Sequence, residues 1–448
     1  MHVARNKGLL FTALSALIII GGTYIAIRYA KGGFRVTDSG LSQETGLLSV
    51  SSLPTGAEVY INNKLVTATS DTIYLDPNQY EVAIRKDGFT EWKKTITLEK
   101  EVVSQASALL FPSAPSLTPL TFTGIENVSP SPDGQKIVFY SASNSAQKKN
   151  GLYILELNDN SLSLQRGARQ ITQDSSTIDL AIASFIWSPD SSQLMIFGKN
   201  REVIVDISRL SEIDSLADIS FRRKQILSDW EDEMALREQQ FLSKFPPAVI
   251  KIATASAINV FFSPDKKRLL YTATRSGELQ PNLIPTIVGT NTQPEERQLQ
   301  AGGIYVYDRE EDKNFRVGTQ VINPKHPAKT LLSIEFGQDQ SSANAIATTS
   351  AHRSLQASSS AQLAKLYQSY HSSLYADTFQ WFPDSKHVFS AEDNRIVVKE
   401  YDNTNAVTVY SGPFYERFLY PWPDGSRLLI ATHFNPETPN NLYAVELR

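Results

Sequence analysis

Five aspartates occupy the same position in a recurring short motif, and carboxylates in such number could serve as general acids or bases. In every copy the aspartate directly follows a proline. The five pairs are Pro132-Asp133, Pro189-Asp190, Pro264-Asp265, Pro383-Asp384 and Pro423-Asp424. Proline presets φ at the second position of a type I turn, and aspartate suits the next position. Because all five aspartates recur at the same place in the motif, we expect these ten residues to form structural turns rather than a catalytic set.

Other residues with reactive side chains are sparse or scattered. The chain has no cysteine, which excludes disulfides, thiol nucleophiles and cysteine-ligated metals. Its six histidines stand singly and form no HExxH motif, and GxSxG, GxxxxGK[ST] and GxGxxG motifs are absent. The sequence therefore predicts a chain that is not an enzyme, with no catalytic residues, no metal site and no cofactor. It identifies no ligand-binding residues.

Charge and length limit the function classes further. Forty-three Lys and Arg against 47 Asp and Glu give a net charge of -4, so no strongly basic surface is expected for nucleic acid. A chain of 448 residues with 41% hydrophobic content predicts roughly two to four domains with well-buried cores.

Each proline-aspartate turn is followed by an apolar segment typical of a strand, and a further strand comes later in each copy. The first segments are 136–140, 193–197, 268–272, 387–390 and 427–432, and the later ones are 152–157, 203–205, 304–307, 396–398 and 442–445. Repeated units of this kind predict a β-propeller. The pattern predicts five blades, and a degenerate sixth blade around 331–336 is the alternative. The segment 117–122 precedes the first turn and is the natural candidate for the outer strand of the last blade.

The motif gives this region a family resemblance. Ser131-Pro132-Asp133-Gly134, Trp187-Ser188-Pro189-Asp190 and Phe262-Ser263-Pro264-Asp265 resemble the W/F-S-P-D-G turn of the TolB-type, WD-related propeller repeat. The resemblance implies a TolB-like β-propeller over 112–448. Copies two to four have Ser191, Lys266 and Ser385 where the family has glycine.

A smaller all-β domain is expected over 46–111. Short alternating runs at 48–50, 57–61, 72–75, 80–84 and 94–98 are separated by turn residues, which predicts a compact antiparallel sandwich. The stretch 50–61, the run 75–82, Lys86-Asp87-Gly88-Phe89 and Trp92 resemble a PEGA domain. The family is named for the signature PEGA, and this chain has PTGA in its place at 54–57. The resemblance implies an extracytoplasmic spacer or binding module. Trp92 and Tyr80 either fill the small core or stack on a sugar.

The N-terminal segment 8–27 lacks charged residues and is rich in Leu, Ile and Ala. At about 1.5 Å per residue it would span about 30 Å, the thickness of a bilayer core. It predicts a transmembrane helix contacting the lipid bilayer through 8–27, with a cytoplasmic tail at 1–7 and a linker at 28–45. A cleaved signal and a buried helix are the alternatives. The predicted location is the cell membrane, single-pass, with the C-terminal domains extracytoplasmic.

Two stretches of the propeller region lack its strand pattern. Residues 208–257 place Leu227, Trp230, Met234 and Phe241 on one helical stripe, and Ser228 and Glu231 have capping-box spacing. They predict a helical insertion that either packs on the propeller or docks a partner. Residues 338–375 are rich in Ser and Ala and predict a mobile loop.

The predicted fold class is therefore all-β: an N-terminal transmembrane helix, a PEGA-like sandwich, and a five- or six-bladed propeller with a helical insertion. The predicted function is a membrane-anchored, non-catalytic scaffold that binds an envelope protein or peptide. The alternative is a protein that binds carbohydrate or cell-wall glycan through the PEGA-like domain or the propeller face.

Overall fold

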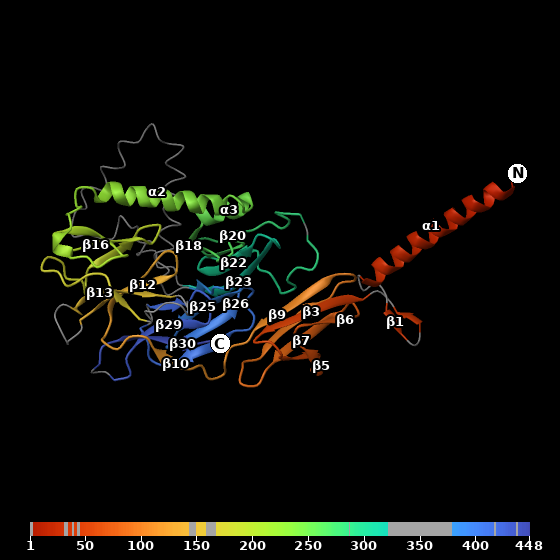
Figure 1. Ribbon diagram of the computed structural model, residues 1–448, viewed down its shortest axis with the longest axis horizontal. Coiled ribbons are helices and arrows are strands. Elements are labelled where there is room, and N and C mark those ends of the chain that lie inside the picture. The colour runs from red at the N-terminus through yellow and green to blue at the C-terminus, as the bar shows by residue number, and fades with distance from the viewer. Residues whose placement is uncertain are drawn as a thin grey trace, which may run out of the picture. The chain divides into compact units, whose positions relative to one another are not determined.

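The chain forms two compact units in a computed structural model (Figure 1). The structure describes residues 3–30, 35–37, 40–42, 45–142, 149–157, 167–285, 287–320, 379–415, 418–435 and 438–448. Unit 1 comprises Met1–Ser113 and Thr286–Pro294, and unit 2 comprises Ala114–Pro285 and Glu295–Arg448. The predicted strand at 331–336 and the predicted Ser-rich loop at 338–375 lie outside the described residues.

Unit 1 begins with the helix α1, Val3–Ala30, followed by a small hairpin of β1, Arg35–Thr37, and β2, Gly40–Ser42. The predicted transmembrane helix at 8–27 is not supported, because no helix in the described part of the chain is long and apolar enough to cross a membrane. The fold-class prediction is corrected accordingly: the chain is mostly β, with few helices.

The rest of unit 1 contains two facing sheets, in the orders β6-β3-β9 and β5-β4-β7-β8. Their alternating buried positions meet in one core that includes Leu48, Val59, Ile84, Trp92 and Ala106. The strands are β3 Gly46–Leu53, β4 Glu58–Ile61, β5 Lys64–Ala68, β6 Asp71–Leu75, β7 Gln79–Arg85, β8 Trp92–Thr97 and β9 Val103–Leu109.

Two details of this domain differ from the sequence prediction. β3 and β9 run parallel, with Leu47 opposite Val103 and Leu53 opposite Leu109, so the sandwich is not wholly antiparallel. β5 and β9 were missed because their patterns are weak. β5 has no buried residue, and β9 buries small Ser and Ala side chains rather than β-branched ones.

The described part of unit 2 contains five sheets of three or four strands, each built around one proline-aspartate turn. Their orders are β11-β12-β13-β14, β15-β16-β17, β18-β19-β22-β23, β24-β25-β26-β27 and β10-β30-β29-β28. In the first three sheets the strands are β11 Glu126–Pro130, β12 Lys136–Ser141, β13 Gly151–Glu156, β14 Arg169–Gln170, β15 Ser184–Trp187, β16 Gln193–Phe197, β17 Glu202–Asp206, β18 Ala257–Phe262, β19 Arg268–Ala273, β22 Gly303–Asp308 and β23 Lys313–Thr319. The others are β24 Gln380–Trp381, β25 His387–Glu392, β26 Arg395–Glu400, β27 Val407–Ser411, β10 Leu117–Pro119, β28 Leu419–Pro421, β29 Arg427–Thr432 and β30 Asn441–Glu446. A small pair, β20 Gly277–Glu278 and β21 Gln298–Leu299, lies between β19 and β22.

The last sheet takes its fourth strand from the segment that precedes the first sheet. Leu117, Thr118 and Pro119 of β10 pair with Val445, Ala444 and Tyr443 of β30. Further on, the Leu442 N–H donates to Thr121 Oγ1 (2.9 Å), and Thr121 Oγ1 donates to Asn441 Oδ1 (3.1 Å). The predicted ring closure through 117–122 is confirmed.

Two helices fill the space between the second and third sheets. They are α2, Arg223–Leu242, and α3, Pro247–Ala255, preceded by the short 3-10 helix η2, Ile213–Ser215. Leu227 and Met234 of α2 pack on Ile186, Met195 and Phe197 of the second sheet. On the other side, Ala235, Leu242, Phe245, Val249 and Ala253 pack on Leu269, Tyr271, Tyr305 and Tyr307 of the third sheet. The two helices thus complete the apolar core beside the second sheet and the apolar core beside the third sheet.

The helical stripe in the insertion therefore packs on the propeller itself, as one of the two predicted readings had it. The predicted capping box is wrong, because α2 begins at Arg223 and Ser228 and Glu231 lie inside it. Pro247 is the first residue of α3, where its fixed φ suits a helix start.

Candidate functional site

The five proline-aspartate turns share one hydrogen-bond pattern. In each, the residue after Asp donates its N–H to the carbonyl three residues back, as Gly134 does to Ser131 (3.0 Å) and Ser385 to Phe382 (3.1 Å). In each, an Asp Oδ1 also accepts the N–H two residues further on. The distances are 3.0 Å at Asp133, 3.1 Å at Asp190, 3.0 Å at Asp265, 2.9 Å at Asp384 and 2.8 Å at Asp424. The carboxylates are occupied in holding the turns.

The electrostatics of the turns agree with this role. Burial opposes ionisation of Asp133, but hydrogen bonds from Lys136, Ser131 and Gln135 hold the pKa of its carboxyl below the ordinary value. At Asp190 the Ser188 hydroxyl is the main cause of a lowered pKa. Burial also opposes ionisation of Asp384, but the charge and hydrogen bond of His387, together with the backbone N–H groups of Lys386 and His387, outweigh it, so the pKa of this carboxyl is lowered too. A general acid would need a raised pKa instead.

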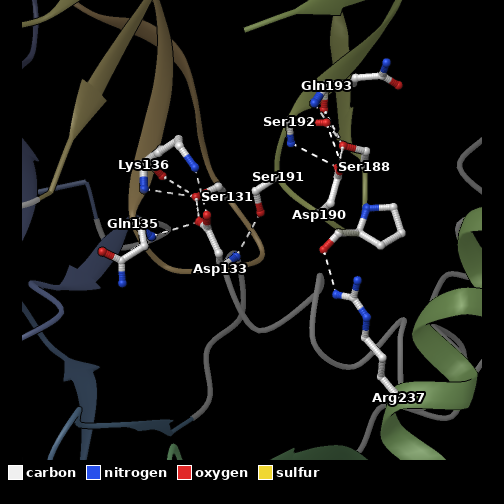
Figure 2. A network of polar contacts seen from close by, with 11 residues as sticks. Ser131, Asp133, Gln135, Lys136, Ser188, Asp190, Ser191, Ser192, Gln193 and Arg237 are labelled. Carbon is white, nitrogen blue, oxygen red and sulfur yellow. Dashed lines mark hydrogen bonds and ion pairs between the residues drawn. The ribbon is translucent and has the colours of Figure 1, made fainter. Parts of the chain in front are cut away.

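The residue after each aspartate adopts the left-handed conformation, and in two of the five copies its side chain also links neighbouring turns. φ is 73° at Gly134, 57° at Ser191, 61° at Lys266, 62° at Ser385 and 71° at Gly425. The Ser191 hydroxyl accepts the Asp133 N–H (3.1 Å), and the Ser385 hydroxyl accepts the Asp265 N–H (3.0 Å). Figure 2 shows Ser191 reaching from its own turn to that of Asp133. From the sequence these serines were recognised only as residues that stand where the family has glycine, and the links were missed.

Glycine is retained in the first and last copies, where the neighbouring sheet comes close. A Cβ on Gly425 would lie 2.9 Å from the Phe382 ring, and one on Gly134 would lie 3.1 Å from the Tyr420 hydroxyl. With the serine links, these contacts place the turns of neighbouring sheets side by side. All five turns therefore lie at one end of the propeller.

Between the second and third sheets, α2 takes the place of a direct link between turns. Arg237 Nη1 donates to the Pro189 carbonyl (3.0 Å). Figure 2 shows Arg237 extending from α2 toward the turn of Asp190. The neighbouring Glu238 interacts with Lys266 of the third turn. Burial, only partly offset by Lys266, raises the pKa of Glu238 to about 7. In the described residues its Oε2 is shielded from solvent and has no hydrogen-bond partner.

Exposed apolar side chains gather at the opposite end of the propeller. Three of these residues lie just before strands that run toward the turns: Phe122 before β11, Ile182 before β15 and Tyr415 before β28. The fourth, Phe434, follows β29, which runs away from its turn. Their exposed fractions are 78%, 80%, 53% and 60%. Large apolar residues so exposed in neighbouring loops are typical of interaction surfaces. We call these four residues the apolar arc.

Hydrogen bonds and ring contacts hold the loops of the apolar arc beside one another. The Ile125 N–H donates to the Asn440 carbonyl (2.8 Å), which joins the Phe122 loop to the Phe434 loop. The Tyr415 N–H donates to the Ala431 carbonyl (2.7 Å), and Phe434 makes an edge contact with Tyr443.

The loop of Ile182 is held by the first sheet. Asn127 Nδ2 donates to the carbonyls of Leu180 (2.9 Å) and Ala183 (2.6 Å). Asn127 itself has φ 50° at a register shift in β11, so the bulge turns its amide toward that loop.

Acidic residues lie beside this end of the first sheet. Burial is the first cause that raises the pKa of Tyr140 to about 12, and Asp174, Glu126 and Asp179 raise it further. Three carboxylates therefore act on one phenol close to the loops of Phe122 and Ile182.

In the PEGA-like domain the aromatic residues serve the core. Trp92 is 3% exposed, and Tyr80 packs against the same core cluster. The core-filling reading of these two residues is confirmed: Trp92 belongs to the core, and Tyr80, which is partly buried, packs against it.

Among the described residues, no group of three or more His, Asp or Glu side chains could hold a metal ion. The absence of metal, cofactor and catalytic residues stays a prediction.

Comparison with known proteins gives one family match. Residues 45–111 match the PEGA domain model. No curated protein matches the chain in sequence. Solved structures with some similarity include TolB from Acinetobacter baumannii, at 11% identity and TM-score 0.16, covering 81% of this chain and 62% of that one.

Two further similar structures are oligogalacturonate lyases. One, from Vibrio parahaemolyticus, is 10% identical with TM-score 0.20, covering 82% of this chain and 74% of that one. The other, in complex with manganese, is 12% identical with TM-score 0.31, covering 75% and 95%. Similarities this low carry no argument about the chemistry of this chain. The match at 45–111 confirms the resemblance to PEGA, and the five turn-bearing sheets of unit 2 themselves form the propeller.

Proposed function

We propose that the chain is a non-catalytic binding scaffold of the cell envelope, whose propeller binds a protein partner at the apolar arc. The observation that carries the proposal is the exposure of Phe122, Ile182, Tyr415 and Phe434 at one end of the propeller. Buried aromatic anchors supply much of the binding energy in protein interfaces. The opposite end is occupied by turns whose carboxylates bond to their own backbone.

The partner that fits this surface is a segment with apolar and basic side chains. The apolar arc offers rings and an isoleucine for apolar contact, and the carboxylates around Tyr140 attract positive charge. The competing glycan function has less support, because Trp92 and Tyr80 belong to the core of their domain.

An extracytoplasmic location is part of the proposal, supported by the PEGA match at 45–111. Fusing a phosphatase that is active only outside the cytoplasm after Arg448 tests it. Activity in intact cells is expected, and a fusion that is inactive although produced at full length would overturn this location.

Site-specific photocrosslinking tests the binding surface. A photoreactive amino acid at Phe122 or Phe434 should capture a protein in intact cells, whereas the same group at the exposed Asp229 of α2 should not. A triple variant, Phe122→Ser, Ile182→Ser and Phe434→Ser, should lose the captured partner while keeping its melting temperature. Equal capture from Asp229, or binding of purified chain to cell-wall polymer that the triple variant abolishes, would contradict a protein partner and favour glycan.

A further inference from the structure

The second sheet is one strand short of the other four. Among the described residues it contains β15, β16 and β17, whereas β14, β23, β27 and β10 each complete a four-stranded sheet. After β17 the chain turns to the neighbouring sheet, where Ser211 donates its N–H to the Ile171 carbonyl (2.8 Å). As a result, no described strand occupies the fourth position of this sheet, beside β17.

The pairing of β16 and β17 shows which backbone groups are left. Gly198 donates to the Arg201 carbonyl (2.9 Å), and Ile207 donates to the Ser192 carbonyl (3.2 Å). Because hydrogen-bonded pairs alternate along an antiparallel ladder, Val203 and Val205 bond to β16, and Ile204 and Asp206 turn their N–H and C=O groups outward.

At the start of this edge, the backbone groups of Glu202 already have hydrogen-bond partners. The Glu202 N–H donates to Asp218 Oδ1 (3.3 Å), and the Glu202 carbonyl accepts the Ile219 N–H (2.9 Å). Among the residues that the structure describes, the open length is therefore Ile204 to Asp206. It matches the three residues over which β10 pairs with β30 and exceeds the two over which β14 pairs with β13.

Both faces beside the open edge are apolar. Ile204 lies in the cluster that includes Ile219, Ile226 and Trp230 near the start of α2. Val203 and Val205 lie in the cluster that includes Ile213 and Leu216. A strand added here would therefore meet apolar side chains above and below.

We propose that the outer edge of β17 binds an extended, apolar strand of a partner protein, which completes the second sheet. The closing of the last sheet by β10 shows that this fold accepts a fourth strand from elsewhere, and strand addition to an open edge is a general mode of peptide binding. The strand lies antiparallel to β17 and exchanges hydrogen bonds with Ile204 and Asp206.

A second copy of the chain fits the edge less well. Two β17 edges paired about a twofold axis would set Asp206 of each opposite Ile204 of the other, against the apolar cluster at α2. The occupant is therefore a different sequence, with apolar residues at consecutive positions. This surface is separate from the apolar arc, so the inference does not depend on the proposed function.

Hydrogen exchange on the full-length chain tests whether the edge is open. The amides of Ile204 and Asp206 should exchange rapidly, and those of Val203 and Val205 slowly. Slow exchange at all four positions would mean that the chain covers this edge itself, and would overturn the proposal.

A labelled peptide with the sequence Lys-Thr-Val-Ile-Val-Thr-Lys then serves as the probe for binding. It should bind the full-length chain in fluorescence anisotropy and slow exchange at Ile204 and Asp206. The same peptide N-methylated at both valines, and a version with serine in place of Val and Ile, should bind at least tenfold more weakly.

A matched pair of variants isolates the backbone contribution. Asp206→Ala and Asp206→Pro both lose the carboxylate, but only proline removes the outward N–H, which an edge strand tolerates. The alanine variant should bind the peptide as the parent does, and the proline variant at least fivefold more weakly. No binding at millimolar peptide, or equal binding by the two variants, would overturn the proposal.

Discussion

Replacing Glu238 by glutamine should make the propeller more stable above neutral pH and leave its stability unchanged in acid. Glu238 is half-buried on α2, its Oε2 is shielded, and burial raises its pKa from 4.5 to about 7. The folded chain therefore binds this proton more tightly than the unfolded chain. Stability is lost as the pH rises through the interval from 4.5 to about 7, and stays constant above it.

The difference between the folded and the unfolded pKa of Glu238 sets the size of this change in stability. At about 1.4 kcal/mol per pH unit, the full displacement corresponds to about 3 kcal/mol. Because the side chain is not sealed from water, we expect a gain of about 1–3 kcal/mol for Glu238→Gln at pH 8. At pH 4 the two chains should be equally stable, since both carry an uncharged group.

Urea unfolding at intervals from pH 4 to pH 9, followed by tryptophan fluorescence, measures this difference. Asp229→Asn is the control, because it removes an exposed carboxylate from the same helix and should leave the pH profile unchanged. Parallel profiles for the parent and Glu238→Gln would refute the reasoning, since they would show that Glu238 ionises as readily in the folded chain as in the unfolded one.

The remaining predictions concern the turns, the ring closure and the small domain. Ser191→Ala should cost about 0.5–1.5 kcal/mol in urea unfolding, because the hydroxyl that accepts the Asp133 N–H is lost; Ser192→Ala, which removes an exposed hydroxyl that bonds to Asp190 within its own turn, is the comparison and should cost less. Thr121→Val should cost about 1–3 kcal/mol, because its buried hydroxyl joins Leu442 and Asn441, and an unchanged unfolding midpoint would mean that these bonds do not hold the closure. Trp92→Ala should destabilise the PEGA domain by about 3–5 kcal/mol and leave the propeller transition in calorimetry unchanged; a shift of both transitions would contradict independent cores.

Strands with strong side-chain patterns could be predicted from the sequence, and weakly patterned ones could not. β12, β16, β19 and β29 follow the proline-aspartate turn and carry runs of large apolar residues, so local spacing locates them. The outer strands β14, β23 and β27 depend on pairing with a neighbour rather than on their own pattern. The parallel pairing of β3 with β9 likewise depends on which strand comes alongside.

The turn residues were foreseeable, but their connections were not. Proline followed by aspartate indicates a turn by local geometry alone. The reach of Ser191 to Asp133 or of Arg237 to Pro189 depends on which sheets are neighbours, and one sequence does not show that. The apolar arc was missed for the same reason, because its four residues lie far apart in the chain and nothing local distinguishes them from core residues.

The closure of the last sheet by β10 sets an order on folding during synthesis. The ribosome makes β10 before any other strand of the propeller, and β30 after all of them. β10 therefore waits without its partner while the other four sheets emerge, and the ring stays open until β30 has been made. A chain stalled before residue 441 leaves β29 with an uncovered edge, which makes such products the ones most prone to aggregate and be degraded.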